Sequence, residues 1–462
     1  MRLSTEPDRD DAAAVAVLHA AFDAGVTLLD TADAYCLDDN DIGHNERLIA
    51  RALSTWDGDR SRIVIATKGG LTRPDGRWEI DARARHLRIA CERSCRALGV
   101  ERIDLYQLHA PDPRTPLATS VRALAALQRD GLVKDIGLCN VTVGQIEEAR
   151  RIAEIASIQV ELNVWNDASI LGGVVQYAIE HAMLVLAHRP LGGRRSLARA
   201  KHHPILNKVA AANGVSPHDV ALAWLRHLSA VIIPLPGATR IETARASARA
   251  QQLVLSEADR LALDEAFPSG RVIRVASPHV PPPRQDAEVV IVMGLPGAGK
   301  TTLTGQFVAD GYHRLNRDES GGTLRALTAD LDRVLSEGVT KVVLDNTYTS
   351  RKSRAGIVLT AHAHGVPVRC VWLATTVDEA QVNAASRLVA TYGRLPADEE
   401  LAALRRHDVA AFLPTVQFRY QRELEPPDAS EGFSSIEQAP FVRQPVTERT
   451  DGKAVIVWCD DL

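Results

Sequence analysis

Long hydrophobic runs and a secretory signal pattern are both missing from this sequence. No apolar run approaches the length of a bilayer span, and the N-terminus lacks the charged and apolar regions of a signal peptide. The six cysteines are scattered, and Cys91 and Cys95, four residues apart in a helical stretch, are more typical of two packed thiols than of a disulfide or a metal site. We therefore expect no membrane partner and a reduced, cytoplasmic compartment.

An excess of positive charge is also missing. The formal net charge is -4, so any contact with nucleic acid must come from a local patch. Lysine occurs at only eight positions, while arginine supplies the rest of the positive charge, so a lysine at a motif position is informative. With 45% hydrophobic and 24% charged residues over 462 residues, the composition predicts a globular chain of two or three domains.

A proline-rich stretch divides the chain. Ser277 to Gln285 reads Ser-Pro-His-Val-Pro-Pro-Pro-Arg-Gln, which cannot hold a regular helix and predicts a semi-rigid linker. We expect a first domain over residues 1–276, a linker over 277–287, a second domain over 288–445 and a C-terminal tail over 446–462. The tail contains one strand-like run, Ala454–Trp458, without an assigned role.

Before the linker, short apolar runs alternate with amphipathic helical stretches, a pattern that indicates a parallel sheet and, at this length, an α/β fold of the (β/α)8 barrel (TIM barrel) type. Seven strands are visible: Val26–Leu29, Ile63–Ala66, Ile103–Leu108, Asp135–Leu138, Ile158–Leu162, Leu184–Ala187 and Val231–Pro234. Helices are expected at Ala12–Ala24, Ala82–Leu98, Leu117–Gln128 and Val143–Ala156. Met1–Thr5 resembles the end of an eighth strand, so either the first strand is truncated to a stub or the true start lies upstream of Met1.

After the linker, the apolar strand Glu288–Met293 runs directly into Gly294-Leu-Pro-Gly-Ala-Gly-Lys-Thr301, which fits a phosphate-binding P-loop. The glycines let backbone N–H groups close around phosphates at a helix N-terminus. Lys300 would reach the β- and γ-phosphates of ATP, and the Thr301 hydroxyl would bind Mg²⁺. The residues assigned to this nucleotide site are Gly294, Gly297, Gly299, Lys300, Thr301 and Thr302. With further strands expected at Lys341–Leu344 and Val368–Leu373, the second domain is predicted to be an ATP-using phosphotransferase on a parallel sheet.

Polar residues after the P-loop point to the acceptor side of the reaction. Asp318 follows a short extended stretch, where its carboxylate could deprotonate an acceptor hydroxyl. Asp345 ends an apolar strand, as expected for a group that orients Mg²⁺ or its waters. Arg351, Arg354 and Arg387 could clamp phosphates, although each taken singly is more often a partner in a surface salt bridge.

These segments together resemble the kinase domain of 5′-hydroxyl polynucleotide kinases, particularly the animal type that is fused to a phosphatase. The resemblance runs from Val290 to about Phe441 and rests on the blocks Asn316-Arg-Asp-x-x-Gly321, Asp345-Asn-Thr, Gly365-Val-Pro-Val-Arg-Cys370, Ala380-x-x-Asn383-x-x-x-Arg387 and Glu431-Gly-Phe-Ser434. It implies that Asp318 is the general base on the 5′-hydroxyl of RNA or DNA and that Arg387 is a lid arginine on ATP. Gly321 departs from phage-type relatives, which carry an arginine there, and the phosphatase module of the animal enzymes is absent. A small-molecule kinase is the alternative.

Four residues of the first domain fall at or just beyond strand ends, on the face where barrel enzymes place their chemistry. They are Asp30, Tyr35, Lys68 and His109. In order and setting they resemble the aldo-keto reductase tetrad, and the similarity covers about Met1 to Phe267. The resemblance implies hydride transfer from NADP(H) to a carbonyl, with Tyr35 as the acid. The Lys68 ammonium would lower the pKa of Tyr35, Asp30 would orient the lysine, and His109 would donate to the substrate oxygen.

The same resemblance assigns the cofactor residues. Cys139 and Asn140 stand in a turn that holds the nicotinamide carboxamide, with Cys139 replacing the usual serine, and Gln159 is its usual partner. His188 lies where the family has an aromatic residue that stacks on the nicotinamide. Gly237 and Arg240 belong to a loop that contacts the adenosine 2′-phosphate, although Thr243 and Ser247 replace the arginine and asparagine of many members.

The combined hypothesis is a cytoplasmic two-domain enzyme for nucleic-acid end repair, with an aldo-keto reductase-like barrel joined to a polynucleotide 5′-kinase. The barrel could reduce aldehydes on damaged sugars or abasic sites. It could instead be a non-catalytic module that binds a dinucleotide and adjusts the kinase. A carbonyl reductase fused to a small-molecule kinase is the third reading.

Overall fold

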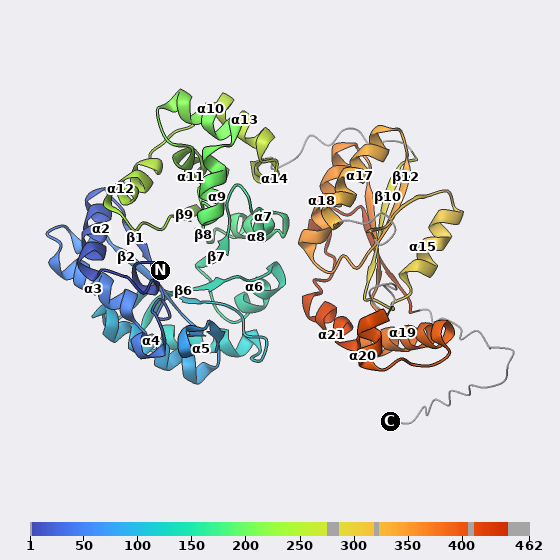
Figure 1. The fold of residues 1–462 in the computed structure, drawn as a ribbon, viewed down its shortest axis with the longest axis horizontal. Coiled ribbons are helices and arrows are strands. Elements are labelled where there is room, and N and C mark those ends of the chain that lie inside the picture. Colours follow the sequence, from blue (N-terminus) through green and yellow to red (C-terminus); the bar gives the residue numbers. More distant parts are fainter. Residues whose placement is uncertain (1, 275–285, 318–322, 405–410, 442–462) are drawn as a thin grey trace. The chain divides into compact units, whose positions relative to one another are not determined.

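The computed structural model describes residues 2–274, 286–317, 323–404 and 411–441. The chain forms two compact units, Met1–Pro278 and His279–Leu462 (Figure 1). The predicted linker and the predicted tail lie largely or wholly outside the described residues.

The first unit is built on a seven-stranded sheet in which every pairing is parallel. The strands follow one another in chain order, as expected for a barrel in which each strand is followed by a helical crossover. They are β1 (Leu28–Asp30), β2 (Val64–Gly69), β5 (Ile103–Leu108), β6 (Val133–Cys139), β7 (Ser157–Glu161), β8 (Leu184–His188) and β9 (Ile232–Leu235). All seven predicted strands are confirmed, with ends that shift by three residues at most.

The expected eighth strand is not formed by the first residues. Arg2–Thr5 is a single helical turn, α1, so the interpretation of Met1–Thr5 as a strand stub is wrong. The Ser4 hydroxyl instead accepts a hydrogen bond from the buried Asn45 side chain at 2.7 Å, which fixes this turn against α3 (His44–Thr55). Within the described residues, β9 and β1 are the two ends of the sheet.

Helices cover the outside of the barrel sheet (Figure 1). Besides α3 they are α2 (Asp11–Asp23), α4 (Ala84–Leu98), α5 (Leu117–Arg129), α6 (Val143–Arg150), α7 (Ala168–Leu171), α8 (Val174–Glu180), α9 (Arg194–Lys201), α10 (Pro204–Asn213), α11 (Pro217–Leu228), α12 (Ile241–Ala250), α13 (Glu257–Ala266) and α14 (Ser269–Arg274). Capping residues set several starts, such as Thr142 and Ser216, which form capping boxes at α6 and α11. The fourth predicted helix ends at Arg150, six residues early. No described helix of either unit has the length and apolar character to cross a membrane.

Two layers of apolar side chains hold the barrel together. A small inner cluster of Ala66, Leu105 and Leu186 fills the space inside the strands. The larger layer lies between the strands and the helices and includes Ile136 and Trp224, both almost fully buried. Side chains alternate across each strand, so one set points into the barrel and the other toward the helices.

The second unit has five parallel strands in the order β11-β12-β10-β13-β14. Their bounds are β10 (Glu288–Gly294), β11 (His313–Leu315), β12 (Lys341–Asp345), β13 (Val368–Leu373) and β14 (Ser435–Ala439). The helices are α15 (Lys300–Ala309), α17 (Leu324–Ser336), α18 (Arg351–Ala363), α19 (Val377–Tyr392), α20 (Asp398–Leu404) and α21 (Pro414–Glu423). The first strand of this unit, β10, lies in the middle of the sheet, so strand order reverses at its carboxyl end. Ligands bind at such points in open α/β sheets.

Alternate residues of β10 pack on opposite faces of this sheet. Val289, Ile291 and Met293 belong to the core beneath α17 and α18, whereas Val290 and Val292 belong to the core that includes Val377 and Ala380 of α19. A strand that is buried on both faces needs a continuous apolar run, which is why Glu288–Met293 was visible as a strand in the sequence.

Candidate active sites

The candidate tetrad of the first unit lies at the carboxyl ends of neighbouring strands. Asp30 is the last residue of β1, Lys68 is the penultimate residue of β2, and His109 directly follows β5. Tyr35 lies in the loop after β1, where its backbone N–H donates to the Ala32 carbonyl. Because all strands are parallel, these positions meet at one rim of the barrel.

Lys68 is the centre of this group. Its side chain is fully buried, and its ammonium donates to the Asp30 carboxylate at 2.7 Å, to the Thr31 carbonyl at 2.8 Å and to the Tyr35 hydroxyl oxygen at 3.2 Å. These three acceptors use all three N–H groups of the lysine. The sequence therefore predicted three residues that the structure brings into direct contact, while the role of the Thr31 carbonyl was not predicted.

Burial and charge oppose each other at Tyr35 and Lys68. Burial raises the pKa of Tyr35, the Lys68 ammonium opposes this, and the net pKa lies above the usual value. The expected effect of Lys68, which is to lower the pKa of Tyr35, is present, but the effect of burial is larger in this state of the protein. Burial alone would lower the pKa of Lys68, but Asp30 and Tyr35 raise it, so the lysine stays charged.

His109 stands edge-on to the Tyr35 ring, with 5.7 Å between ring centroids and an interplanar angle of 77°. Burial, with the Lys68 charge as the second cause, keeps the pKa of His109 well below its usual value. The imidazole is therefore neutral and has one N–H to donate. Its buried Nδ1 has no hydrogen-bond partner among the described residues. A neutral donor beside the phenol suits a site that receives a carbonyl oxygen.

Two glutamines complete the shell around Asp30. Gln159 of β7 donates to Asp30 Oδ1 at 2.7 Å, and Gln107 of β5 donates to the same oxygen at 3.4 Å. The Cys139 thiol is buried and contacts the Gln107 side-chain oxygen at 3.9 Å. Gln159 thus contacts the tetrad itself. Gln107 was missed because a single glutamine inside an apolar strand gives no signal in the sequence.

The residues expected to hold the nicotinamide lie on the adjacent strand ends. Asn140 follows β6 with a left-handed φ of 57°, and its side chain donates to the His109 carbonyl at 3.2 Å. Its side-chain oxygen lies 3.3 Å from His188 Nε2, at the end of β8. Gly237 and Arg240 are exposed in the loop between β9 and α12, and Arg240 is the residue that precedes the first turn of α12.

The P-loop of the second unit connects β10 to α15, as predicted. Gly294, Gly297 and Gly299 have φ values of 158°, 90° and 97°, conformations that favour glycine. A Cβ on Gly297 would lie 2.3 Å from the Ala380 carbonyl of α19, so the loop has no room for a side chain there. The α15 helix begins at Lys300, which places the N-terminal backbone N–H groups of the helix at the loop.

Side chains from inside and outside the loop hold it in shape. The Lys300 ammonium donates to the carbonyls of Gly294 and Leu295, both at 2.9 Å. Gln417 of α21 is buried and donates to the Pro296 carbonyl at 2.8 Å. Thr301 and Thr302 are exposed on the first turn of α15. The Gln417 contact was not predicted, because a lone glutamine 121 residues away carries no pattern.

Asp345 ends β12, as predicted, but its carboxylate is already engaged. It accepts hydrogen bonds from Arg314 Nη2 at 2.8 Å and from Asn316 Nδ2 at 2.5 Å, and its side chain is 2% exposed. A direct bond to Mg²⁺ would require these donors to move. This geometry fits better with Asp345 contacting water molecules bound to Mg²⁺ than with a direct bond to the metal.

The comparisons with known proteins divide the chain in the same way as the fold. The profile of the aldo/keto reductase family matches residues 1–267, more than half of the chain. The chain belongs to the aldo/keto reductase family. An uncharacterized oxidoreductase of Schizosaccharomyces pombe is 31% identical over 258 residues, which are 56% of this chain and 80% of that protein. The profile of an AAA domain matches residues 289–408.

Solved structures of similar proteins also match the reductase half. A glycerol dehydrogenase from Gluconobacter oxydans is 28% identical, with 56% of this chain and 86% of that chain covered and a TM-score of 0.48. An aldo/keto reductase from Klebsiella pneumoniae in complex with NADP and acetate is 27% identical, with the same shares covered and a TM-score of 0.48.

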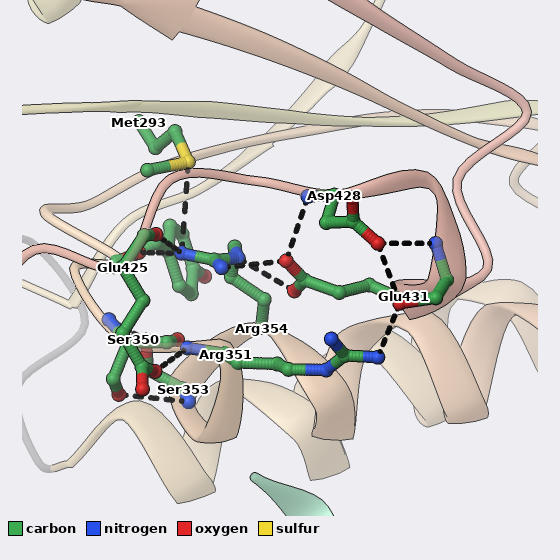
Figure 2. A network of polar contacts seen from close by, with 10 residues as sticks. Met293, Ser350, Arg351, Ser353, Arg354, Glu425, Asp428 and Glu431 are labelled. Atoms are coloured by element: carbon green, nitrogen blue, oxygen red, sulfur yellow. Dashed lines mark hydrogen bonds and ion pairs between the residues drawn. The ribbon is translucent and has the colours of Figure 1, made fainter. Parts of the chain in front are cut away.

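In the P-loop unit, one residue that was predicted to bind phosphate has a different role. Arg354 is fully buried, and its guanidinium forms a two-pronged ion pair with Glu431 at 2.6 and 2.8 Å (Figure 2). Its Nη1 donates to the carbonyls of Tyr348 and Glu425 at 2.9 and 3.0 Å. All of its donor atoms are thus used inside the protein, and the expectation that Arg354 clamps phosphate is wrong.

Of the other residues predicted for this unit, two arginines lie within the described residues and two loop residues do not. Arg351 Nη2 donates to the Ser430 hydroxyl at 2.8 Å (Figure 2). Arg387 lies in α19, half-buried, with its guanidinium carbon 5.7 Å from the Phe412 ring centroid. Asp318, the predicted general base, and Gly321 lie outside the described residues.

Proposed function

We propose that this chain is a bifunctional enzyme that reduces a carbonyl group with NADP(H) and transfers the γ-phosphate of ATP to the 5′-hydroxyl end of RNA or DNA. The observation that carries the first activity is the contact of one buried ammonium, Lys68, with both Asp30 and Tyr35. The observation that supports the second is the glycine loop, from Gly294 to Gly299, at the start of α15.

The reductase site fits a nicotinamide cofactor on chemical grounds. The Gln159 and Asn140 amides and the His188 ring line neighbouring strand ends, and amides are suitable partners for a carboxamide. When bound, the nicotinamide would supply the hydride for the carbonyl carbon. Tyr35 would give its phenolic proton to the carbonyl oxygen, Lys68 would stabilise the phenolate that remains, and neutral His109 would donate a hydrogen bond to the same oxygen.

Arg240 supports NADP(H) over NAD(H), because it is exposed in the loop that, by the family resemblance, contacts the adenosine 2′-phosphate, and a guanidinium could pair with that phosphate. Thr243 and Ser247, at positions where many relatives have Arg and Asn, lack a positive charge, so Arg240 would make the main charged contact.

The P-loop fits a nucleoside triphosphate. Three glycines with positive φ, followed by a helix N-terminus, are the elements that bind phosphates through backbone N–H groups. Lys300 now caps two loop carbonyls and would turn to the phosphates, and the exposed Thr301 hydroxyl would hold Mg²⁺. We propose Asp318 as the base on the acceptor hydroxyl and Arg387 as a ligand of the ATP phosphates, on the strength of the sequence blocks that resemble polynucleotide kinases.

We propose functional domains over residues 1–276 and 288–445, joined by a linker over 277–287. The family profile over 1–267 and the compact unit that ends at Pro278 support the first boundary. A reduced cytoplasmic compartment is part of the proposal. The five described cysteines are all free, and all five are buried.

The decisive test of the kinase is transfer of labelled γ-phosphate from ATP to a 5′-hydroxyl oligonucleotide, supplied as RNA and as DNA. We expect transfer by the wild-type chain and loss of transfer in Asp318→Ala. Asp310→Ala, an exposed acid at the far end of α15, is the matched control and should leave the rate unchanged. Faster transfer to small alcohols than to either strand would instead assign a small-molecule kinase.

A further inference from the structure

One segment of the reductase unit differs in charge from the rest of the chain. From His181 to His218 there are six Lys and Arg residues and no Asp or Glu. This segment has a formal charge of +6 in a chain whose total is -4, so all other residues together carry -10. The segment includes α9 and α10, drawn in green in Figure 1. A local excess of positive charge in an otherwise acidic chain is a feature that a nucleic-acid contact would require.

The cations on these helices are exposed and are not neutralised by neighbours. Arg199, Lys201 and Lys208 are all exposed, and none forms an ion pair with another described residue. Elsewhere in the same segment, Arg189 pairs with Glu161 at 3.4 Å. Asp259, which contacts α10 through Asn213, accepts hydrogen bonds from Asn213 and Ser256.

An aromatic ring holds one of these cations in place. The Arg199 guanidinium lies over the Trp165 ring, 3.9 Å from its centroid. Trp165 is itself fixed edge-on by His203 and Phe267, with centroids at 5.4 and 5.6 Å. A guanidinium over an aromatic face can still direct N–H groups outward in its own plane, and because its position is held, less side-chain entropy is lost when it binds a phosphate.

The helix that carries Arg199 is also anchored to the barrel. The His218 ring nitrogen Nε2 lies 3.1 Å from the Leu197 carbonyl, which ties α11 to α9. The cations therefore project from a fixed helix rather than from a loose loop.

We propose that the exposed cations of α9 and α10, Arg199, Lys201 and Lys208, bind the phosphate backbone of single-stranded nucleic acid. The inference rests on the proposed function in that the kinase acceptor would be the same class of molecule. Contacts between cations and phosphates give binding to a strand without sequence preference. The reductase unit would then contribute to holding the nucleic acid, in addition to any chemistry on carbonyls.

The test is binding of a fluorescent single strand that already carries a 5′-phosphate, so that binding is measured without kinase turnover. Anisotropy is recorded with the full chain over a series of salt concentrations. In the variant Arg199→Ala/Lys201→Ala/Lys208→Ala we expect the slope of log affinity against log salt to shrink by about 2, because each phosphate contact on a single strand contributes about 0.7.

A matched control removes three exposed cations from α4 and α5, Arg96→Ala/Arg122→Ala/Arg129→Ala, and should keep the wild-type slope. Lys201→Glu/Lys208→Glu, which leaves the Arg199–Trp165 stack intact, should weaken binding further through repulsion and guards against misfolding of the triple variant. An unchanged slope in both α9–α10 variants overturns the inference. A loss in the control variant that equals theirs also overturns it.

NADPH affinity, followed by protein fluorescence, separates this surface from the cofactor site. We expect it to be unchanged in the α9–α10 variants, and a parallel loss of NADPH and strand binding would assign these cations to the cofactor and overturn the inference. Strand binding by a wild-type chain that fails to phosphorylate 5′-hydroxyl ends would overturn the proposed acceptor and leave this inference supported.

Discussion

The guanidinium of Arg354 and the carboxylate of Glu431 form a buried ion pair with two parallel hydrogen bonds. Arg354 lies in the first turn of α18, and Glu431 ends the short 3₁₀ turn Ala429–Glu431, four residues before the start of β14. The strand β14 is mostly exposed and polar, so apolar burial contributes little to its docking. The pair, together with the Ser434 N–H bond to the Val368 carbonyl at 2.8 Å, fixes this edge of the sheet.

Loss of one partner of this pair should destabilise the P-loop unit strongly. Removing a single member of a buried ion pair leaves the other charge unpaired and costs about 3–5 kcal/mol. We expect Arg354→Met and Glu431→Gln each to lower the unfolding midpoint of this unit in urea, and the double variant Arg354→Met/Glu431→Met to lose less than either. Arg351→Ala is the control: Arg351 lies three residues before Arg354 in α18 but is partly exposed, so its loss should change the unfolding midpoint only slightly. If Arg354→Met kept full stability and lost only ATP affinity, a phosphate-binding role would be restored.

Tyr35→Phe should abolish reduction and leave cofactor binding in place. The change removes the only proton that the Tyr35 side chain can give, and loss of a positioned acid lowers kcat by about 10²- to 10⁴-fold. NADPH oxidation with a panel of aldehydes measures the rate, and fluorescence titration measures cofactor affinity. Tyr177→Phe, on α8, is the matched control and should keep the wild-type rate. Equal, low rates in both variants and the wild type would favour a non-catalytic, dinucleotide-binding barrel.

The strands of the barrel and the tetrad were visible in the sequence because their signals are local. Each apolar run is contiguous; Asp30, Lys68 and His109 lie at or just after the ends of such runs, and Tyr35 lies in the loop that follows the first of them. The role of Arg354 was not visible, because the sequence shows an arginine but not its burial by a partner 77 residues away. The burial that raises the pKa of Tyr35 was not visible for the same reason, since desolvation is a property of the packed site. Met1–Thr5 was misread because five residues are too few to show a helical or a strand period.

Gly297→Ala should block nucleotide binding. The new Cβ would lie 2.3 Å from the Ala380 carbonyl at a φ of 90°, so either the loop or α19 must shift. We expect ATP affinity, measured by calorimetry, to fall by at least about tenfold, which corresponds to about 1.4 kcal/mol. Gly305→Ala in α15 is the matched control, since a Cβ there meets nothing within 4 Å. It should bind ATP normally and stabilise the helix by about 0.5–1 kcal/mol.

Asp33 should make the reductase unit lose stability as pH rises from about 4 to about 7. Its side chain is fully buried, and burial, followed by the nearby Glu46 carboxylate, raises its pKa to about 7, while Arg93 opposes the shift. An aspartate in the unfolded chain titrates near 3.9. Between those values only the folded state holds the proton, so folding becomes less favourable with rising pH, and the effect levels off above about 7.

Asp33→Asn removes this titration, so the difference in unfolding free energy between wild type and variant should change with pH in that window alone. One proton allows a slope of at most about 1.4 kcal/mol per pH unit. Denaturant titrations at several pH values measure it, with Asp39→Asn, an exposed acid of the same loop, as the control without a pH-dependent difference. A flat difference between pH 4 and 8 for Asp33→Asn would show that Arg93 keeps Asp33 ionised throughout. The two buried carboxylates, Asp33 and Glu46, would then share no extra proton in the folded state at neutral pH.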